Sequence, residues 1–142
     1  MKLQSLPCYC ATLRQAARAA TTLYETVLAD SGLHATQYTA LQVLQSAPKL
    51  TTTELAEAIG IDQTTATRTL ALIRKKALVV AVPGSDRRER RWALTSAGET
   101  SVRKLTPAWE AAQQAFEKHI GRAEAAALKR ASYLAARKLA AG

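Results

Sequence analysis

Residues 51–77 contain two short amphipathic helix patterns separated by one glycine, and this arrangement restricts the fold more than any other feature of the chain. Threonines can cap the first helix, and Gly60 follows it where the chain must turn sharply. Asp62 can cap the second helix, which is expected to run from residue 63 to about residue 77. Its apolar stripe consists of Ala66, Leu70, Ile73 and Ala77. The segment therefore predicts a helix, a tight turn and a second helix.

The second helix has one face that can pack and an opposite face that can bind a partner. At 100° per residue, the opposite face carries Thr64, Arg68, Ala71 and Lys75, with Thr67 at its edge. Hydroxyl side chains and an arginine near a helix N-terminus suit entry into the major groove of DNA. The alternative is that Thr64, Thr65, Thr67 and Thr69 are ordinary exposed positions, but threonine loses side-chain freedom in a helix, so propensity does not explain them. We assign recognition to this helix, with the candidate DNA contacts Thr64, Thr65, Thr67 and Arg68.

A basic β-hairpin is expected after this helix. Residues 78–82 form a β-rich run, a turn begins at Pro83, and residues 91–95 supply a return strand. The expected tip, residues 85–90, is rich in arginine. The charged residues in and beside it are Asp86, Arg87, Arg88, Glu89, Arg90 and Arg91. An arginine at such a tip can enter the minor groove, where the potential is negative. A solvated charged loop is the alternative reading.

Helical patterns flank this central part on both sides. Apolar and small residues recur at helical spacing over residues 12–28 and again over residues 36–46. From residue 96 onward the pattern is helical once more, with interruptions expected at Pro107 and Gly121. The predicted fold is mainly α with a small β wing, in the order of four helices, two strands and two helices.

The charge of the chain indicates a polyanionic partner. The 142 residues include 20 Lys and Arg against 11 Asp and Glu, for a formal charge of +9 and a pI of about 10.0. Nucleic acid is the first candidate, and a basic pI that only aids solubility is the alternative. The N-terminal residues do not resemble a signal peptide and no apolar run reaches membrane-spanning length, so we expect a cytoplasmic protein without a membrane partner.

The residues that could support catalysis or bind a metal are few. Cys8 and Cys10 are the only cysteines, and His34 and His119 lie far apart in the sequence. We therefore expect no metal, no cofactor and no catalytic residue. A basic helical module that binds nucleic acid or protein without sequence specificity remains the alternative to a sequence-specific regulator. The aromatic residues of the chain are too scattered in the sequence to form the stacking surface of an RNA-binding protein.

Two sequence blocks resemble a known family in both order and spacing. Residues 53–61 read TELAEAIGI and are followed by TTATR at 64–68, and residues 86–98 read DRRERRWALTSAG. These blocks resemble the MarR (multiple antibiotic resistance regulator) family of winged helix-turn-helix transcriptional regulators. Two residues depart from the family pattern, because Ala66 stands where valine is common and Ala77 where glycine is usual.

The resemblance covers essentially the whole chain and implies one MarR-like domain over residues 1–142. A helical dimerisation part would comprise residues 8–34 and 100–142, and a winged helix-turn-helix part would comprise residues 36–99. Such a homodimer binds a pseudo-palindromic operator in double-stranded DNA, commonly as a repressor that a small ligand or thiol oxidation releases. By motif position, Arg88 would enter the minor groove and Asp86 would position it. Arg87, Arg90 and Arg91 are further candidate contacts.

One of the N-terminal cysteines, Cys10, is a candidate redox sensor. Cys10 opens the first helix, where the helix macrodipole and Arg14 would favour the reactive thiolate. The sequence around Cys8, Cys10 and Tyr24 is similar to that of the organic-hydroperoxide-sensing branch of the family. In that branch, the cysteine that matches Cys10 is oxidised, and the tyrosine that matches Tyr24 hydrogen-bonds it. The second tyrosine of that branch is replaced by Ala35. Inert cysteines, a small aromatic ligand or no effector are the alternatives. Cys8 and Cys10 are poorly placed to bridge within a chain.

Overall fold

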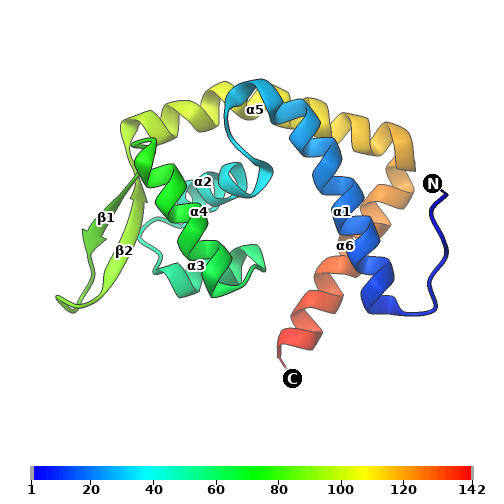
Figure 1. Cartoon of the computed structure of the whole chain (residues 1–142), viewed down its shortest axis with the longest axis horizontal. Helices are drawn as coiled ribbons and strands as arrows, with labels where there is room; N and C mark the ends of the chain where they lie inside the picture. Colours follow the sequence, from blue (N-terminus) through cyan, green and yellow to red (C-terminus); the bar gives the residue numbers. More distant parts are fainter. Residues whose placement is uncertain (1, 142) are drawn as a thin grey trace. The chain divides into compact units, whose positions relative to one another are not determined.

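The computed structural model describes residues 2–141 and has the predicted order of elements (Figure 1). The elements are α1 (Tyr9–Leu28), the 3₁₀ turn η1 (Ala29–Ser31), α2 (Ala35–Ser46), α3 (Thr52–Ile59), α4 (Gln63–Lys75), β1 (Val79–Pro83), β2 (Arg90–Leu94), α5 (Ser96–Ile120) and α6 (Arg122–Ala140). The prediction of a mainly helical chain with a small β wing is confirmed. No helix within residues 2–141 is long and apolar enough to cross a membrane.

The chain forms two compact units. One unit combines the residues up to Val27 with those from Ala108 onward, and the other comprises residues Leu28–Pro107. The second unit has a well-filled core, to which α2 contributes Tyr38, Leu41 and Leu44 on one buried face, as its spacing predicts. Helices α3 and α4 and the hairpin add the other large buried side chains, Leu55, Leu70, Ile73 and Trp92. This unit therefore gives α4 a rigid support.

Capping fixes the start and the end of α3. The Thr51 hydroxyl accepts a hydrogen bond from the backbone N–H of Glu54 at 3.1 Å, and the Glu54 carboxylate accepts one from the N–H of Thr51 at 2.9 Å. This reciprocal capping box satisfies two backbone donors at the helix N-terminus. The helix ends at Gly60, whose φ of 81° is left-handed and favours glycine. Local sequence alone thus accounts for this helix.

The end of α4 differs from the prediction. The helix ends at Lys75, so Ala77 is not part of the buried stripe; it is exposed and has a left-handed φ of 58°. The N–H of Leu78 donates to the carbonyl of Ile73 at 3.0 Å, and the N–H of Ala77 donates to that of Arg74 at 2.8 Å. These bonds form a Schellman motif, which positions an alanine where glycine is usual. The motif, rather than the apolar period, decides where α4 ends.

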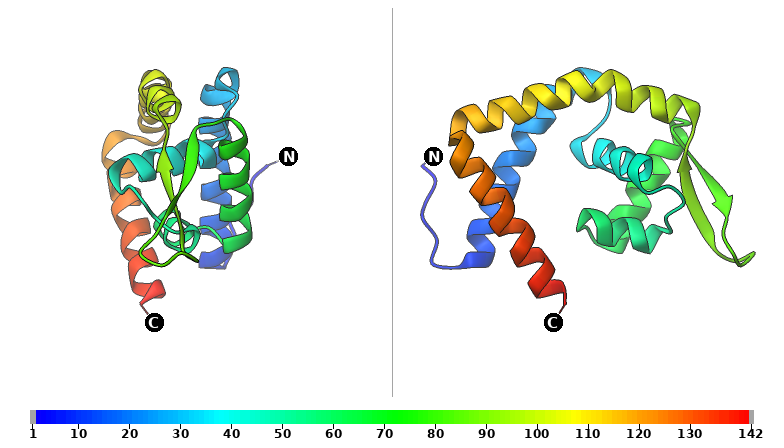
Figure 2. Two further views of the ribbon diagram at one scale, coloured as in Figure 1. Left: turned by 90° about the vertical axis from the view of Figure 1, so that its left-hand side faces the viewer. Right: turned by 180° about the vertical axis from the view of Figure 1, so that it is seen from behind.

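Strands β1 and β2 form a twisted antiparallel hairpin (Figure 2). Their register pairs Val79 with Leu94 and Pro83 with Arg90. The predicted turn at Pro83 and tip at residues 85–90 are therefore each wrong by one residue, because Pro83 and Arg90 both belong to strands and the loop is residues 84–89. Proline is tolerated there because a strand end at the edge of a sheet does not need its N–H.

A short motif joins the hairpin to the start of α5. Thr95 was expected in the return strand, but its hydroxyl donates to the carbonyl of Ala77 at 2.6 Å and accepts from the N–H of Gly98 at 3.1 Å. A Cβ atom at Gly98 would overlap the carbonyl oxygen of Leu78. The Leu-Thr-x-x-Gly sequence is thus explained by close packing of α5 against the beginning of β1.

The interruption predicted at Pro107 does not occur, because α5 continues through it to Ile120. Proline removes one hydrogen bond, to the carbonyl of Arg103. Both residues are exposed, so water can satisfy that carbonyl at little cost. The second predicted interruption is confirmed, because Gly121 separates α5 from α6 and has a φ of 100°.

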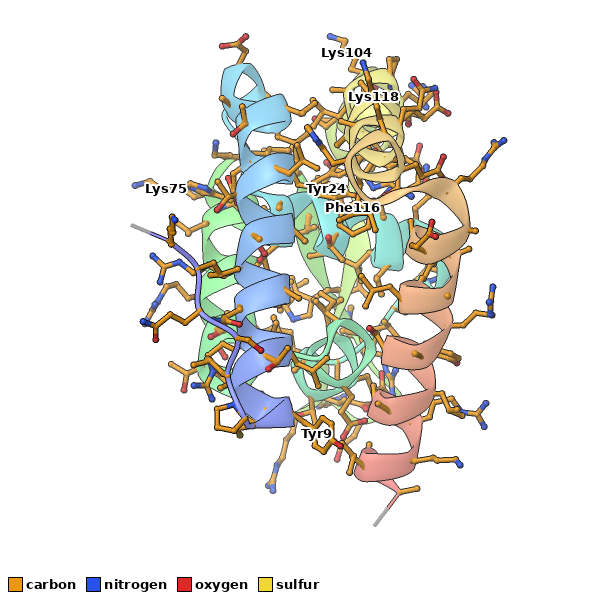
Figure 3. All side chains as sticks on the ribbon, turned by 90° about the vertical axis from the view of Figure 1, so that its right-hand side faces the viewer. Tyr9, Tyr24, Lys75, Lys104, Phe116 and Lys118 are labelled. Carbon is orange, nitrogen blue, oxygen red and sulfur yellow. The ribbon has the colours of Figure 1, made fainter. Side chains whose placement is uncertain are left out.

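The unit built from α1, the second half of α5 and α6 has very little core of its own. Among residues 2–27 and 108–141, only Ala112 and Ala125 are more than nine-tenths buried. An apolar cavity of about 870 Å³ lies among the three helices, and Tyr24 and Phe116 project toward it between α1 and α6 (Figure 3). Its other lining residues include Leu13, Ala16, Ala17, Ala20, Trp109, Ala126 and Leu128. A substantial apolar surface therefore stays open in the isolated chain.

Candidate nucleic-acid interface

The first turn of α4 is held by its N-cap residue. One oxygen of Asp62 accepts the backbone N–H of Thr65 at 2.8 Å, and the other accepts the hydroxyl of Thr65, also at 2.8 Å. These hydrogen bonds, that from the backbone N–H first, hold the pKa of the Asp62 carboxyl below its ordinary value of 3.8. The start of the helix is thereby fixed without help from a ligand.

The predicted contact face of α4 is open to solvent. Thr64, Thr67 and Arg68 are exposed, whereas Thr65 is half-buried and Thr69 is 7% exposed. The Thr67 hydroxyl donates to the carbonyl of Gln63 at 2.9 Å, so its oxygen can still accept from a partner. Thr69 therefore packs in the core, and the other three threonines remain available at the surface.

The wing tip is organised by its own hydrogen bonds. A carboxylate oxygen of Asp86 accepts the backbone N–H of Arg88 at 3.2 Å, and the Asp86 carbonyl accepts the N–H of Glu89 at 3.0 Å. Asp86 therefore contacts the backbone of Arg88, whose guanidinium pairs with no side chain within residues 2–141. Arg87 and Arg88 are both exposed.

Arg91 lies at the base of the wing and differs from the other arginines. Its guanidinium donates to Glu89 at 2.7 Å, to Glu54 at 3.1 Å and to the carbonyl of Lys49 at 2.8 Å. The hydrogen bond between Arg91 and Glu89 is the main reason why the pKa of Glu89 is lowered and that of Arg91 is raised. Arg91 is thus engaged within the protein.

A groove of about 470 Å³ runs between α4 and β2. It is lined by Thr52, Thr67, Leu70, Ala71, Arg74, Lys75, Arg90 and Trp92, and none of these residues is acidic. The Arg74 guanidinium lies 5.8 Å from the centre of the Trp92 ring, whose N–H donates to the hydroxyl of Thr52 at 3.0 Å. Arg74 was not identified as a candidate contact from the sequence. Its position, three residues after Ala71 and seven after Thr67, places it beside the predicted binding face of the helix and was the signal that could have found it.

The start of the helix-turn-helix and the tip of the wing lie at the same end of this unit. The beginning of α4, helix α3 and the hairpin tip share the same side of the unit in the views of Figures 1 and 2. Arg68 is an exposed residue in the second turn of α4, and Arg87 and Arg88 are exposed residues of the tip. The unit therefore presents a helix with exposed hydroxyl groups beside an arginine-rich loop, which is a suitable arrangement for a polyanion with two grooves.

The predicted sensing residues do not form a site within one chain. Cys8 and Cys10 are exposed free thiols, and Arg14 lies 3.5 Å from the sulfur of Cys10. Tyr24 is on the same helix, and a separation of 14 residues corresponds to about 21 Å along the axis. Burial, and then the Glu117 carboxylate, raise the pKa of Tyr24. A hydrogen bond between Tyr24 and Cys10 would therefore have to join two copies of the chain.

Comparison with known proteins agrees with this architecture. A family model described as MarR family matches residues 31–89, and no curated protein matches the chain. The transcriptional regulator MosR of M. tuberculosis is 33% identical over 90% of this chain and 97% of its own, with a TM-score of 0.74. MosR in complex with DNA is similar at 34% identity, over 90% of this chain and 98% of that one, with a TM-score of 0.72.

Two more distant structures share the fold. Bordetella bronchiseptica BpsR is 23% identical over 100% of this chain and 99% of its own. Streptomyces coelicolor PcaV is 22% identical over 96% of this chain and 98% of its own. Both structures have a TM-score of 0.80. The chain therefore belongs to the MarR family of transcriptional regulators, which are winged-helix DNA-binding proteins and not enzymes.

Proposed function

We propose that this regulator is a homodimeric, sequence-specific repressor that binds a pseudo-palindromic operator. Helix α4 would lie in the major groove and the wing in the adjacent minor groove. The observation that carries the proposal is the exposure of Arg68 on α4 and of Arg87 and Arg88 on the wing, within the same Leu28–Pro107 unit. The DNA complex of MosR supports DNA as the partner.

The proposed contacts come from α4 and from the wing. Thr64, Thr65, Thr67 and Arg68 would bind base edges and phosphates in the major groove. Arg88 would enter the minor groove, with Arg87 and Arg90 beside it on the DNA backbone. Asp86 would act by holding the backbone of Arg88. Each neutralised phosphate should reduce log K by about 0.9 per log unit of salt, so binding should weaken steeply with ionic strength.

The homodimer is proposed because one unit is incomplete without a partner. The unit containing α1 and α6 has an open apolar cavity of about 870 Å³ and only two buried residues, Ala112 and Ala125, among its described residues. A second copy of the chain would supply the missing core. We assign dimerisation to residues 8–34 and 100–142 and DNA binding to residues 36–99. Two-fold symmetry then requires operator half-sites about one helical turn apart.

Two mechanisms could release the repressor from DNA, and each has a supporting observation. In the first, the Cys10 thiolate beside Arg14 attacks an organic hydroperoxide; the O–O bond breaks, an alcohol leaves, and Cys10 becomes a sulfenic acid that a thiol can reduce. In the second, a small aromatic molecule binds the dimer. BpsR, whose DNA binding is regulated by 6-hydroxynicotinic acid, and PcaV, solved with its natural ligand, support the second mechanism.

The experiment is a fluorescence-anisotropy titration of the protein against the DNA just upstream of its own coding region, with a scrambled duplex as competitor. Preferential binding to the upstream duplex supports the proposed function. Equal binding to both duplexes would instead support a basic module without sequence specificity. Repeating the titration with an organic hydroperoxide, and then with added thiol, separates the release mechanisms. Only the Cys10 mechanism predicts that the hydroperoxide abolishes DNA binding, that thiol restores it, and that Cys10→Ser keeps binding DNA in the presence of the hydroperoxide.

A further inference from the structure

Arg91 connects three segments that are distant in the sequence but belong to the same unit. It is the second residue of β2, and its guanidinium reaches the turn after α2 through the carbonyl of Lys49 at 2.8 Å. It reaches α3 through Glu54 at 3.1 Å and the end of the wing loop through Glu89 at 2.7 Å. One side chain therefore links the wing to the helix-turn-helix.

Glu54 extends this link to the start of α3. The same oxygen that accepts from Arg91 also accepts the backbone N–H of Thr51 at 2.9 Å in the capping box. On the backbone, the N–H of Lys49 donates to the carbonyl of Trp92 at 3.0 Å, and the N–H of Trp92 donates to that of Leu50 at 2.9 Å. The base of the wing is thus attached to the helix-turn-helix through main chain and side chain together.

The link also reaches the residues proposed to enter the minor groove. Arg91 holds the carboxylate of Glu89, the backbone N–H of Glu89 donates to the carbonyl of Asp86 at 3.0 Å, and the Asp86 carboxylate accepts the N–H of Arg88 at 3.2 Å. A continuous series of hydrogen bonds therefore runs from Glu54 on α3 to the backbone of Arg88.

Arg91 is a poor candidate for a direct phosphate contact. Its side chain is 27% exposed, and three of its five N–H donors already bond within the protein. Together with Glu54 and Glu89 it forms a cluster of one positive and two negative charges. The two carboxylates offset the single positive charge of Arg91, so Arg91 attracts a phosphate less than an unpaired arginine would.

We infer that Arg91 is a positioning residue, which joins the wing to α3 through Glu54 and Glu89 and so sets the direction from which Arg88 approaches DNA. The inference rests on the proposed function, because it assumes that Arg88 contacts the operator. It changes the role expected for Arg91 from a DNA contact to a support for one. A guanidinium is needed here because lysine, as a single point charge, cannot bridge two carboxylates and a carbonyl in fixed geometry.

Three substitutions test this role by operator affinity. Arg91→Ala removes the link and should weaken binding at least about five-fold, at the lower end of what one good base contact is worth. Arg91→Lys should restore little of this loss, whereas a phosphate contact would be largely restored by lysine. Glu54→Gln keeps an acceptor for the α3 cap but removes the ion pair. It should weaken binding, although removal of a negative charge would by itself strengthen attraction to DNA.

A double-mutant cycle with Arg88→Ala separates positioning from direct contact. If Arg91 acts through Arg88, then Arg91→Ala should cost little further affinity once Arg88 is already alanine. Lys2→Ala, in the exposed segment before α1, controls for the loss of one positive charge. Melting temperature and circular dichroism of every variant show that the fold is retained. Arg91→Lys, the smallest change, keeps the test valid if Arg91→Ala unfolds.

The outcomes distinguish the inference from the proposed function. Native affinity that does not differ between upstream and scrambled duplexes would overturn the proposed function, and the inference with it. Specific binding that falls with Arg88→Ala but not with Arg91→Lys or Glu54→Gln would overturn the inference alone. Additive losses for Arg88→Ala and Arg91→Ala would do the same, because they would indicate two independent contacts.

Discussion

At the scale of single residues, Ala77 occupies a conformation that its side chain disfavours. It follows α4 with a φ of 58°, and its N–H and that of Leu78 complete the Schellman motif that ends the helix. An L-residue in this region pays about 1–2 kcal/mol relative to a right-handed conformation. The hydrogen bonds of the motif and the burial of Leu78, which is 8% exposed, offset this cost and determine the direction of the chain after α4.

Ala77→Gly should therefore stabilise the protein. Glycine relieves the left-handed strain but gains entropy when unfolded, so we expect a net increase in the free energy of unfolding of about 0.5–1 kcal/mol. Urea denaturation at a fixed protein concentration measures it. Ala71→Gly, an exposed position inside α4, is the matched control and should destabilise by a similar amount. Loss of stability in Ala77→Gly would contradict the explanation.

Arg88 is the residue on which the proposed minor-groove contact depends. Arg88→Ala should weaken operator binding by about 1–3 kcal/mol, or roughly 5- to 150-fold, since its exposed guanidinium makes no contact within the described residues that would be lost. Anisotropy titration measures the affinity, and sedimentation should show an unchanged oligomeric state. Lys2→Ala, in the exposed segment before α1, serves as the charge control. Unaltered affinity of Arg88→Ala would remove the wing from the mechanism.

At the scale of elements, α4 depends on the ionised carboxyl of Asp62 at its N-terminus. Two hydrogen bonds from Thr65 favour the anion and lower its pKa below 3.8. A lowered pKa in the folded state means that the unfolded chain binds the proton more tightly. The stabilising contribution of Asp62 is therefore fully present above about pH 4 and is lost as the pH falls through the lowered pKa.

Asp62→Asn tests this pH dependence because asparagine caps a helix well but does not titrate. The melting temperature of the native protein, minus that of Asp62→Asn, should be constant above about pH 5 and should decrease as the pH falls below 4. Other carboxyl groups contribute equally to both proteins and cancel. Asp62→Ala should lower the melting temperature at pH 7 by removing the cap. A difference that did not vary with pH would show that the Asp62 charge adds nothing.

At the scale of the whole molecule, the two units differ in how much of their apolar surface each buries by itself. The Leu28–Pro107 unit buries a full set of large side chains, including Tyr38, Leu55 and Ile73. The other unit leaves Leu13, Leu128 and Leu134 at least 38% exposed. An open surface of this kind on a protein marks an interaction site, and the proposed occupant is a second copy.

Leu128→Glu should therefore prevent dimerisation. Leu128 lines the cavity among α1, α5 and α6, and a carboxylate buried in this largely apolar lining would raise the dimer dissociation constant by about 100-fold or more. Analytical ultracentrifugation at micromolar concentration measures the change. The neighbouring Ala127→Glu is the matched control, because Ala127 is exposed and does not line the cavity. A dimeric Leu128→Glu would place the interface elsewhere.

The positions of the helices and strands followed from the sequence because their signals are local. Threonine and aspartate caps, the glycine at position 60 and the apolar periods all act within a few residues, and each predicted element lies within a few residues of its observed place. The exceptions also have physical causes. Proline at position 107 is tolerated on an exposed face of α5, and the left-handed turn at Ala77 ends α4 although the apolar period continues.

The sequence by itself determined the fold class, the family and the set of residues that could reach DNA, because caps, periodicity and motif spacing are local properties. Only the tertiary structure decided which of those residues are available. Thr69 is buried, and Arg91 is engaged by Glu54 and Lys49, which lie 37 and 42 residues away in the sequence. Arg88, in the same basic run, remains exposed. The motif singled out Arg88, but no local pattern showed that Arg91 is engaged within the protein, because Glu54 and Lys49 reach Arg91 only when the helix-turn-helix and the wing pack against each other.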